Sequence, residues 1–326
     1  MLVDNPARYE AACFTKEGGQ LEMQRMNFID PFPSTEVVLR VLATGLNAND
    51  YSSAYRLIGD MPHFPLTPGQ VCVGKVAAVG GNSRFKLEEV CGAVMRGGAL
   101  AEYVVVREDA LVPLDLNGLK PEEAVIPLFQ GAKLFASFRN NTYGENDLVV
   151  VHGQGGFARL AIDLYKRGLG HQNLVLITHD LNAKAEDYGL DKDEMLVVGT
   201  DNIAKKLREK GRARAVVCVD APEHSMQEVI QGMLDDARFV LQIPSQKELR
   251  VPTAEFVWRG LSLCGSPYAS PKVTQDALAL FRDKALAIRI KPFKFTETGV
   301  RDAWRHLSKG DAWDAPVVVF KEGERQ

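Results

Sequence analysis

The chain has 326 residues, of which 46% are hydrophobic and 25% are charged, and its formal net charge is −3. This length predicts two domains, because a single domain usually holds about 100–200 residues. The nearly balanced charge argues against nucleic acid or an anionic membrane as a partner, and no apolar run reaches the ~20 residues that cross a bilayer.

The cysteines and the first residues indicate the cellular compartment. The chain has five scattered cysteines and no Cys-x-x-Cys pair: Cys13, Cys72, Cys91, Cys218 and Cys264. An odd, dispersed set favours reduced core residues over a disulfide framework or a structural zinc site. The segment 1–6 lacks the basic-then-apolar order of a signal peptide. We therefore expect a soluble, cytoplasmic protein.

The first 125 residues alternate short apolar segments with Gly and Pro turns. The pattern predicts strands over 36–43, 74–80 and 101–106. Short strands at this spacing are typical of a small β-barrel or β-sandwich.

After Pro121 the pattern changes, and helical stretches alternate with apolar runs. The runs predict six strands of a doubly wound parallel sheet, over 148–152, 174–178, 195–198, 215–219, 239–243 and 261–264. A helix over 297–307 and a strand over 316–320 follow. Because a completed six-stranded sheet has no place for them, we expect these two elements to return to the first domain.

A glycine-rich turn links the first of the six strands to a helix. Gly153 permits the tight turn, Gly155 lets the backbone approach a phosphate, and Ala158 is small enough for close packing of the helix on the strand. The helix N-terminus adds unpaired N–H groups and a partial positive charge. The order predicts that the pyrophosphate of a dinucleotide binds at Gly153, Gln154, Gly155, Gly156, Phe157 and Ala158. The alternative is a plain glycine-rich turn between strand and helix.

An acid follows the second of the six strands. Asp180 stands 25 residues after Gly155, near the spacing of about 20 at which an acid binds the adenosine ribose and repels a 2′-phosphate. This favours NAD(H) as the cofactor without excluding NADP(H). In the alternative interpretation, Asp180 caps the next helix, and His179 and Lys184 lie near a 2′-phosphate.

Short motifs occur in a fixed order along nearly the whole chain. They are 45–50 (Gly-Leu-Asn-Ala-Asn-Asp), 65–69 (Pro-Leu-Thr-Pro-Gly), 98–103 (Gly-Ala-Leu-Ala-Glu-Tyr), the glycine turn, 219–221 (Val-Asp-Ala) and 265–266 (Gly-Ser). In order and spacing the chain resembles the medium-chain dehydrogenase/reductase superfamily, in particular its zinc-free quinone-oxidoreductase-like branch. The resemblance implies a GroES-like β-barrel domain over 1–125 and 292–326, a Rossmann domain over 126–291, and an active site in the cleft between them.

The resemblance also implies that the catalytic zinc of other branches is absent. Asn47 stands where zinc-dependent members carry a cysteine, and Gln70 stands where they carry a histidine. No cysteine occurs between Cys91 and Cys218 to supply a third ligand. Because zinc prefers thiolate, imidazole and carboxylate ligands, we expect no metal.

The resemblance implies residues for the nicotinamide end of the site. Asn47 is expected beside the nicotinamide ribose, and Tyr51 or Tyr55 to donate a proton or line the pocket, unless these tyrosines are packing residues. Lys133 replaces a common threonine and is expected to bind ribose or an anionic substrate, unless it faces outward from its helix. Asp50 is expected to be structural. The remaining cofactor-binding residues follow later strands: Asp220, Ala221, Ile243, Gly265 and Ser266.

Together these features predict an NAD(P)H-dependent oxidoreductase that transfers hydride to a quinone, an enone or another activated carbonyl or alkene. A small molecule is the expected substrate, and a homodimer joined through the strand at 261–264 and the loop after it is the expected assembly. Two departures leave a non-catalytic nucleotide-binding or redox-sensing protein open. Leu87–Cys91 replaces the Gly-Asp turn of the family, and the loop from there to Gly97 is short.

Overall fold

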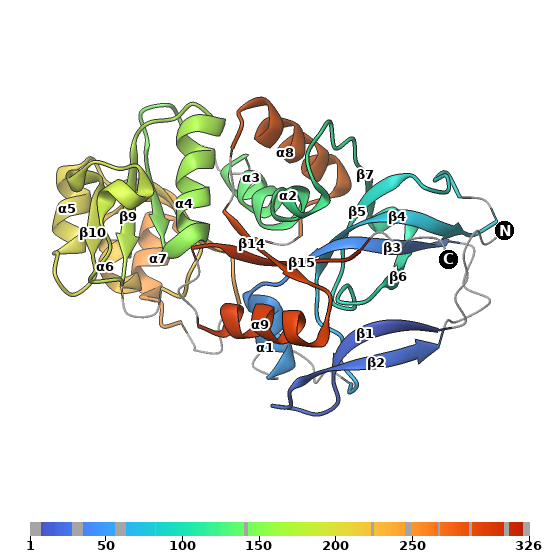
Figure 1. Cartoon of the computed structure of the whole chain (residues 1–326). Helices are drawn as coiled ribbons and strands as arrows, with labels where there is room; N and C mark the ends of the chain where they lie inside the picture. The colour runs from blue at the N-terminus through green and yellow to red at the C-terminus, as the bar shows by residue number, and fades with distance from the viewer. Residues whose placement is uncertain are drawn as a thin grey trace. The chain divides into compact units, whose positions relative to one another are not determined.

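The computed structural model describes residues 8–27, 35–55, 63–81, 83–139, 143–222, 225–244, 249–266, 268–286, 289–309 and 313–321. The chain forms two compact units, which are described here separately (Figure 1). The barrel unit comprises residues 1–129, 270–278 and 288–326, and the Rossmann unit comprises residues 130–269 and 279–287. The predicted α/β fold class is confirmed, whereas the predicted domain limits stay a prediction.

Two sheets make up the strands of the barrel unit. The strands β1 (Arg8–Phe14) and β2 (Leu21–Asn27) form an antiparallel pair. The seven-stranded sheet has the order β14-β15-β3-β4-β5-β7, with β6 also paired to β3. Its strands are β3 (Glu36–Gly45), β4 (Val71–Val79), β5 (Val90–Val94), β6 (Tyr103–Arg107), β7 (Leu111–Pro113), β14 (Ile290–Lys294) and β15 (Ala315–Val319). All three strands that the sequence predicts for this region are present.

The tail of the chain completes this sheet, as the sequence predicts. Strand β15 pairs antiparallel with β3, and the helix α9 (Glu297–Ser308) buries Val300, Ala303 and Trp304 in the core of the unit. Strand β14 was not predicted, and it begins at Ile290, inside the range expected for the Rossmann domain. It lies at the edge of the sheet and contains Pro292, which weakens the strand signal in the sequence.

The segment Leu87–Cys91 contains a non-glycine residue in a left-handed backbone conformation. Glu88 has φ +64, in the left-handed region that costs a residue with a side chain about 1–2 kcal/mol. The Glu89 carboxylate accepts a hydrogen bond from the Lys86 N–H (2.9 Å), and the Glu88 N–H donates to the Val76 carbonyl (2.8 Å). Glu88 therefore holds a left-handed backbone that glycine would adopt without this cost.

The Rossmann unit contains one parallel sheet of six strands, in the order β10-β9-β8-β11-β12-β13. Its strands are β8 (Leu148–His152), β9 (Leu174–Thr178), β10 (Met195–Val197), β11 (Ala213–Cys218), β12 (Met233–Leu241) and β13 (Ser262–Gly265). All six predicted strands are present, with ends that differ by a few residues. The strand order reverses between β8 and β11, which is where doubly wound sheets bind ligands beyond the carboxyl ends of their strands.

Helices cover both faces of this sheet, and Figure 1 shows α4 on one side of β9 and β10 and α5 on the other. Leu148 and Val150 of β8 share a core with Ile203 and Leu207 of α5. The central strands β8 and β9 are buried at every residue, which explains why they form continuous apolar runs in the sequence. The α-helices before α9 are α1 (Ala48–Ala54), α2 (Pro121–Ile126), α3 (Ala132–Arg139), α4 (Gly155–Asp163), α5 (Ile203–Glu209), α6 (Met226–Gln231), α7 (Thr253–Arg259) and α8 (Pro271–Asp283).

Five short helical segments of other types complete the list. Three are 3₁₀ helices, η1 (Glu108–Ala110), η4 (Ala185–Tyr188) and η5 (Lys192–Glu194), and two are π-helical, η2 (Pro127–Gly131) and η3 (Leu164–Gly168).

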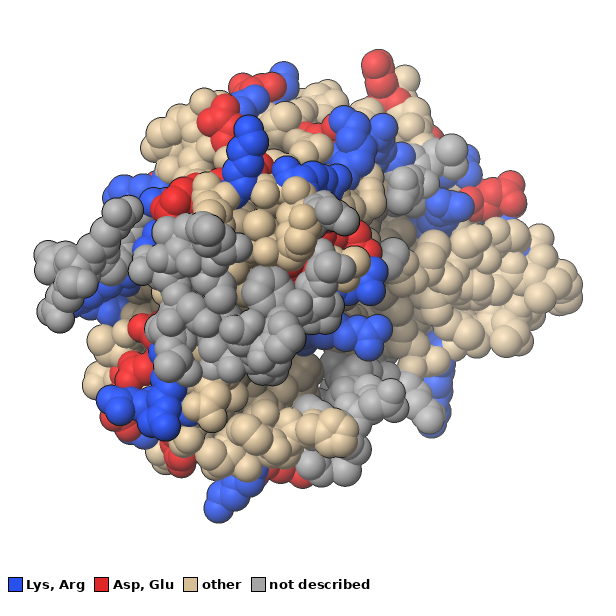
Figure 2. All heavy atoms as spheres, turned by 90° about the vertical axis from the view of Figure 1, so that its right-hand side faces the viewer, with Lys and Arg blue, Asp and Glu red and all other residues tan. Residues whose placement is uncertain are grey.

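The surface carries mixed charge. On the face drawn in Figure 2, basic and acidic side chains are interspersed over the described residues, as the small net charge leads one to expect. Among the described residues, no helix has the length and apolar character needed to cross a membrane.

Candidate functional site

The glycine turn has the geometry that its sequence predicts. It begins directly after β8, where Gly153 has φ +154, and a Cβ atom there would lie 2.5 Å from Cγ2 of Val219. Gly155 has φ +64, again in the left-handed region. Ala158 is fully buried, so the first turn of α4 packs closely against the unit's interior. Only glycine fits position 153, because both the backbone angle and the neighbouring chain exclude a side chain.

Of the first three N–H groups of α4, one donates a hydrogen bond to a described residue. The Gly155 N–H donates to the hydroxyl of Tyr188 (2.9 Å), a contact that the sequence did not predict. Among the described residues, none accepts a hydrogen bond from the N–H of Gly156 or Phe157, and both residues are partly exposed. Unpaired N–H groups at a helix N-terminus, with the helix dipole behind them, form a binding site for an anion.

Arg159, in the first turn of the same helix, is held away from this N-terminus. Its Nε donates to the Asp163 carboxylate (2.8 Å), and its Nη1 donates to the carbonyl of Asp187 (2.9 Å). These bonds join α4 to the segment before Gly189. The arginine therefore serves as a link within the Rossmann unit.

Asp180 follows β9 and forms a turn of its own. Its Oδ1 accepts the Asn182 N–H (2.9 Å), and its carbonyl accepts the Ala183 N–H (3.2 Å). The alternative that Asp180 caps the next helix is wrong, because η4 begins at Ala185 with Lys184 as its cap. Among the described residues, none donates a hydrogen bond to Oδ2 of Asp180.

Two histidines meet beneath the glycine turn. His152, the last residue of β8, is fully buried, and its Nε2 lies 2.7 Å from the Ser225 hydroxyl. The ring of His179 packs edge-on against it, with centroids 5.0 Å apart. Burial, and secondarily the nearby His179, lower the pKa of His152 to about 3, so its ring is neutral at physiological pH. The sequence offers no local signal for this contact, since Ser225 is 73 residues away.

A polar cluster lies where β12 and β13 end. The Lys133 ammonium donates to the Gln242 carbonyl (2.7 Å), so the alternative of an outward-facing lysine is wrong. The Gln242 side-chain amide bonds to the Ser137 hydroxyl, which in turn lies 2.9 Å from the Ser266 hydroxyl. Burial lowers the pKa of Lys133 to about 8. Lys133 and Ser266, both predicted cofactor-binding residues, thus belong to one network that also contains the unpredicted Ser137 and Gln242.

The other predicted cofactor-binding residues of this unit lie at the same edge of the sheet. Asp220, after β11, accepts the Ala221 N–H on its Oδ1 (2.8 Å), and its Cβ would touch any side chain at position 153. Ile243 follows β12, and Gly265 ends β13. Because the carboxyl ends of parallel strands meet at one edge, all of these positions and the glycine turn fit a single extended ligand.

In the barrel unit, Asn47 caps α1 through a capping box. Its Oδ1 accepts the Asn49 N–H (2.8 Å), and its own N–H donates to the Asp50 carboxylate (2.9 Å). The Nδ2 of Asn47 is buried, and no described residue accepts a hydrogen bond from it. A buried donor without an acceptor fits a hydroxyl or carbonyl oxygen from outside the chain.

The prediction that Asp50 is structural is confirmed. Its two oxygens accept the N–H groups of Asn47 (2.9 Å) and Gly69 (2.8 Å). Burial raises the pKa of Asp50 to about 7, although both hydrogen bonds act in the opposite direction.

Tyr51 and Tyr55 are half-buried and contact each other, with ring centroids 4.6 Å apart. Tyr51 also stacks on Trp304, at 5.9 Å and 20° between ring planes. These contacts support the alternative in which both tyrosines are packing residues of the barrel core.

The two positions that correspond to zinc ligands in other branches carry amides. Asn49, next to Asn47, donates from its Nδ2 to Oε1 of the buried Gln70 (3.2 Å). Among the described residues, no group of three or more His, Cys, Asp or Glu side chains is arranged to hold a metal ion.

Comparison with known proteins agrees with this geometry. Residues 33–116 match the alcohol dehydrogenase GroES-like domain. The chain is 27% identical to the alcohol dehydrogenase notN of Aspergillus sp. (strain MF297-2), over 97% of this chain and 99% of that protein. It is 28% identical to the chloroplastic quinone-oxidoreductase homolog of Spinacia oleracea, over 60% of this chain and 62% of that protein.

Two solved structures share the fold. The short chain alcohol dehydrogenase rspB of E. coli CFT073, complexed with NADH, has a TM-score of 0.79 at 17% identity and covers 97% of this chain and 100% of its own. The CAD of Helicobacter pylori, complexed with NADP(H), has a TM-score of 0.78 at 16% identity and covers 97% of this chain and 99% of its own. Residues 33–116 thus match a GroES-like domain, and over nearly its whole length the chain is similar in sequence and in fold to medium-chain alcohol dehydrogenases.

Proposed function

We propose that the chain is a zinc-independent NAD(P)H-dependent oxidoreductase that reduces a quinone, an enone or another activated carbonyl or alkene. The observation that carries the proposal is the glycine turn after β8, at the switch point of the sheet, where no described residue accepts the N–H groups of Gly156 and Phe157. These two groups bind the pyrophosphate, and Gly153 and Gly155 let it approach the backbone.

Asp180 favours NAD(H) over NADP(H) in this proposal. The Oδ2 atom, which no described residue engages, accepts the hydroxyls of the adenosine ribose, and the carboxylate repels a 2′-phosphate. The two similar structures include one complexed with NADH and one complexed with NADP(H), so the preference rests on Asp180.

The bound cofactor supplies the hydride, and the chain supplies position and hydrogen bonds. Asn47 donates from its Nδ2, which has no acceptor among the described residues, to the nicotinamide ribose or to the substrate oxygen. Amides at positions 47 and 70 are poor zinc ligands, so hydrogen-bond donors must polarise the acceptor. Conjugated acceptors suit this arrangement because they spread the developing negative charge. Tyr51 and Tyr55 are proposed as further donors or as walls of the substrate pocket.

The test is a pair of measurements on the purified chain. Calorimetry is expected to show association with NADH, and a panel of quinones and enones is expected to contain acceptors that the chain reduces at the expense of NAD(P)H. Asn47→Ala is expected to lower this turnover at least tenfold while the fold is retained. Binding of neither coenzyme would falsify the proposal. Binding without turnover on the panel would instead favour the alternative of a non-catalytic nucleotide-binding or redox-sensing protein.

We also propose that two copies of the chain associate through β13. Strand β13 ends the sheet, with β12 as its partner among the described strands, and Leu263 is exposed on it. The preceding helix α7 presents Val257 and Trp258, which are 77% and 85% exposed. Large apolar side chains beside an unpaired strand edge are typical of a contact between subunits.

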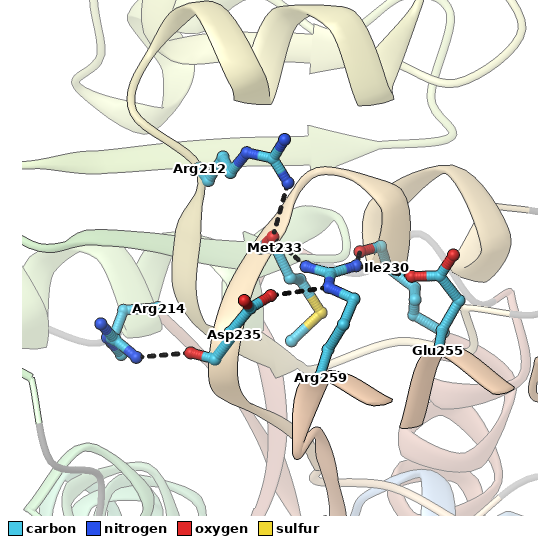
Figure 3. Close-up of polar contacts among 7 residues, drawn as sticks. All are labelled: Arg212, Arg214, Ile230, Met233, Asp235, Glu255 and Arg259. Atoms are coloured by element: carbon cyan, nitrogen blue, oxygen red, sulfur yellow. Dashed lines mark hydrogen bonds and ion pairs between the residues drawn. The ribbon is translucent and has the colours of Figure 1, made fainter. Parts of the chain in front are cut away.

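Arg259, the residue after Trp258, ties the end of α7 to its neighbours through the polar contacts that Figure 3 shows. It donates to the carboxylates of Asp235 (2.9 Å) and Glu255 (2.8 Å) and to the carbonyls of Ile230 (3.1 Å) and Met233. Arg212 and Arg214 donate to the carbonyls of Met233 and Asp235. The end of α7 is thus fixed to α6 and β12, and Trp258 projects from a rigid support.

A further inference from the structure

A buried amine lies at the carboxyl edge of the Rossmann sheet. The Nζ of Lys133 donates to the Gln242 carbonyl (2.7 Å), and Gln242 comes directly after β12. The Gln242 N–H donates to the Cys218 carbonyl, and the Ser266 N–H donates to the Leu241 carbonyl, both at 2.9 Å. The amine is therefore fixed where β11, β12 and β13 end.

The two halves of a doubly wound sheet each take one mononucleotide of a dinucleotide. The glycine turn and Asp180 belong to the half formed by β8, β9 and β10, which takes the adenosine. The half formed by β11, β12 and β13 takes the nicotinamide mononucleotide. If the proposed function holds, on which this inference rests, Lys133 lies in the nicotinamide half.

A second observation points to a ligand at the same place. Gln242 is 2% exposed, and no described residue donates a hydrogen bond to its Oε1. Its Nε2 is engaged by Ser137, which also contacts Ser266. A buried acceptor left open in a connected polar cluster fits a donor from outside the chain, and a carboxamide N–H₂ supplies one.

We propose that the ammonium of Lys133 makes this site select the reduced coenzyme over the oxidised one. The oxidised nicotinamide ring carries a positive charge, whereas the reduced ring is neutral. A buried ammonium repels the first and leaves the second unaffected, because a protein interior screens charge far less than water does. Burial lowers the pKa of Lys133 to about 8, so the amine still carries its charge at neutral pH. The chain would then hold the hydride donor and release the spent coenzyme.

The test compares the dissociation constants of NADH and NAD⁺ by calorimetry in wild type, Lys133→Gln and Lys133→Thr. The glutamine keeps a donor without the charge, and threonine is the residue that relatives commonly carry there. The ratio of the NAD⁺ constant to the NADH constant is expected to fall about tenfold or more in both variants. Lys133→Arg, which keeps the charge, is expected to keep a ratio near that of wild type.

Ser137→Ala is the matched control, because it breaks the polar cluster without changing any charge. Its ratio is expected to stay within about twofold of wild type, even if both affinities change. Thermal unfolding shows which variants are folded. If Lys133→Gln and Lys133→Thr weaken the binding of NADH and NAD⁺ by the same factor, the inference is overturned. Lys133 would then contribute to the binding of both forms without distinguishing between them. If wild type binds neither form, the proposed function fails first.

Discussion

The hydroxyl of Tyr188 lies 2.9 Å from the amide nitrogen of Gly155 and accepts the hydrogen bond of the first N–H of α4. Tyr188 is fully buried in the 3₁₀ helix that follows the second strand of the Rossmann sheet. This contact ties η4 to the glycine turn. The phenol engages the first N–H of α4, and no described residue accepts the next two.

Tyr188→Phe is therefore expected to destabilise the chain by about 1 kcal/mol, because the Gly155 N–H loses its acceptor. Urea unfolding followed by circular dichroism measures the change. Tyr165→Phe is the control, since the buried Tyr165 hydroxyl has no hydrogen-bond partner among the described residues. Its removal is expected to be neutral or slightly stabilising. Equal losses in the two variants would show that the Tyr188–Gly155 bond contributes nothing specific.

Glu88→Gly is expected to stabilise the chain by about 0.5–1 kcal/mol. Glycine relieves the left-handed strain at φ +64, and its greater entropy in the unfolded chain offsets part of the gain. The ion pair that Glu88 forms with Arg40 (3.3 Å) is on the surface and contributes little. Glu88→Ala, which loses the ion pair and keeps the strain, is expected to lie within about 0.5 kcal/mol of wild type. A lower melting temperature for Glu88→Gly than for Glu88→Ala would contradict this account.

Acidification is expected to destabilise the chain through His152. Burial and His179 lower its pKa from 6.5 to about 3 in the folded state, so the unfolded chain binds more protons between these values. The stability that depends on neutral His152 is complete above pH 6.5 and falls as the pH drops toward 3, by at most about 1.4 kcal/mol per pH unit. Denaturant midpoints measured from pH 7 to pH 4.5 test this.

His152→Gln, which cannot take up a proton, is expected to show a shallower loss over the same range. Asp50 acts in the opposite direction, because its folded pKa of about 7 lies above the ordinary 3.8, and protonation on folding stabilises the chain as the pH falls between these values. The comparison of His152→Gln with wild type removes the Asp50 contribution, since both chains contain it. Parallel pH profiles for the two would rule out His152 as the cause.

Asp180→Ala is expected to erode the preference for NADH over NADPH about tenfold. The variant removes the carboxylate that we propose repels a 2′-phosphate and accepts the ribose hydroxyls. Fluorescence titration of both reduced coenzymes gives the ratio of dissociation constants. Asp187→Ala, at an acid of the neighbouring η4, is the control, because only the backbone carbonyl of Asp187 bonds to Arg159. If the ratio of the two dissociation constants is unchanged in Asp180→Ala, Asp180 only stabilises its own turn and does not select the coenzyme.

The wild-type chain is expected to sediment as a dimer at micromolar concentration, and Trp258→Arg is expected to shift it toward monomer. The substitution places a charge at the centre of the exposed apolar surface of α7, which a partner would have to bury. Leu119→Arg is the control, since Leu119 is also an exposed apolar residue but lies in the barrel unit. A wild-type chain that sediments as monomer would reject the dimer.

The sequence by itself determined the features that depend on nearby residues. The central strands β8 and β9 are fully buried apolar runs, the turn at 153–155 needs glycine for its backbone angles, and the helix over 297–307 has its apolar residues at helical spacing. Such signals can be recognised in the sequence alone, because hydrophobic periodicity and the need for glycine depend on only a few neighbouring residues. Strands β1, β2, β5, β7 and β14 were not predicted from the sequence, and in β14 Pro292 interrupts the apolar pattern.

Tertiary structure alone decided which side chains meet. Lys133 and Gln242 are 109 residues apart, His152 and Ser225 are 73 apart, and Tyr188 and Gly155 are 33 apart. No local pattern in the sequence predicts these pairs, because the two partners of each pair belong to different elements of the Rossmann unit. Long-range packing also buries the Lys133 ammonium and supplies the Tyr188 hydroxyl as acceptor for the Gly155 N–H. It leaves Nδ2 of Asn47 without an acceptor among the described residues. Burial then set the protonation of Lys133, His152 and Asp50, since a pKa shift depends on the surroundings that the folded chain provides.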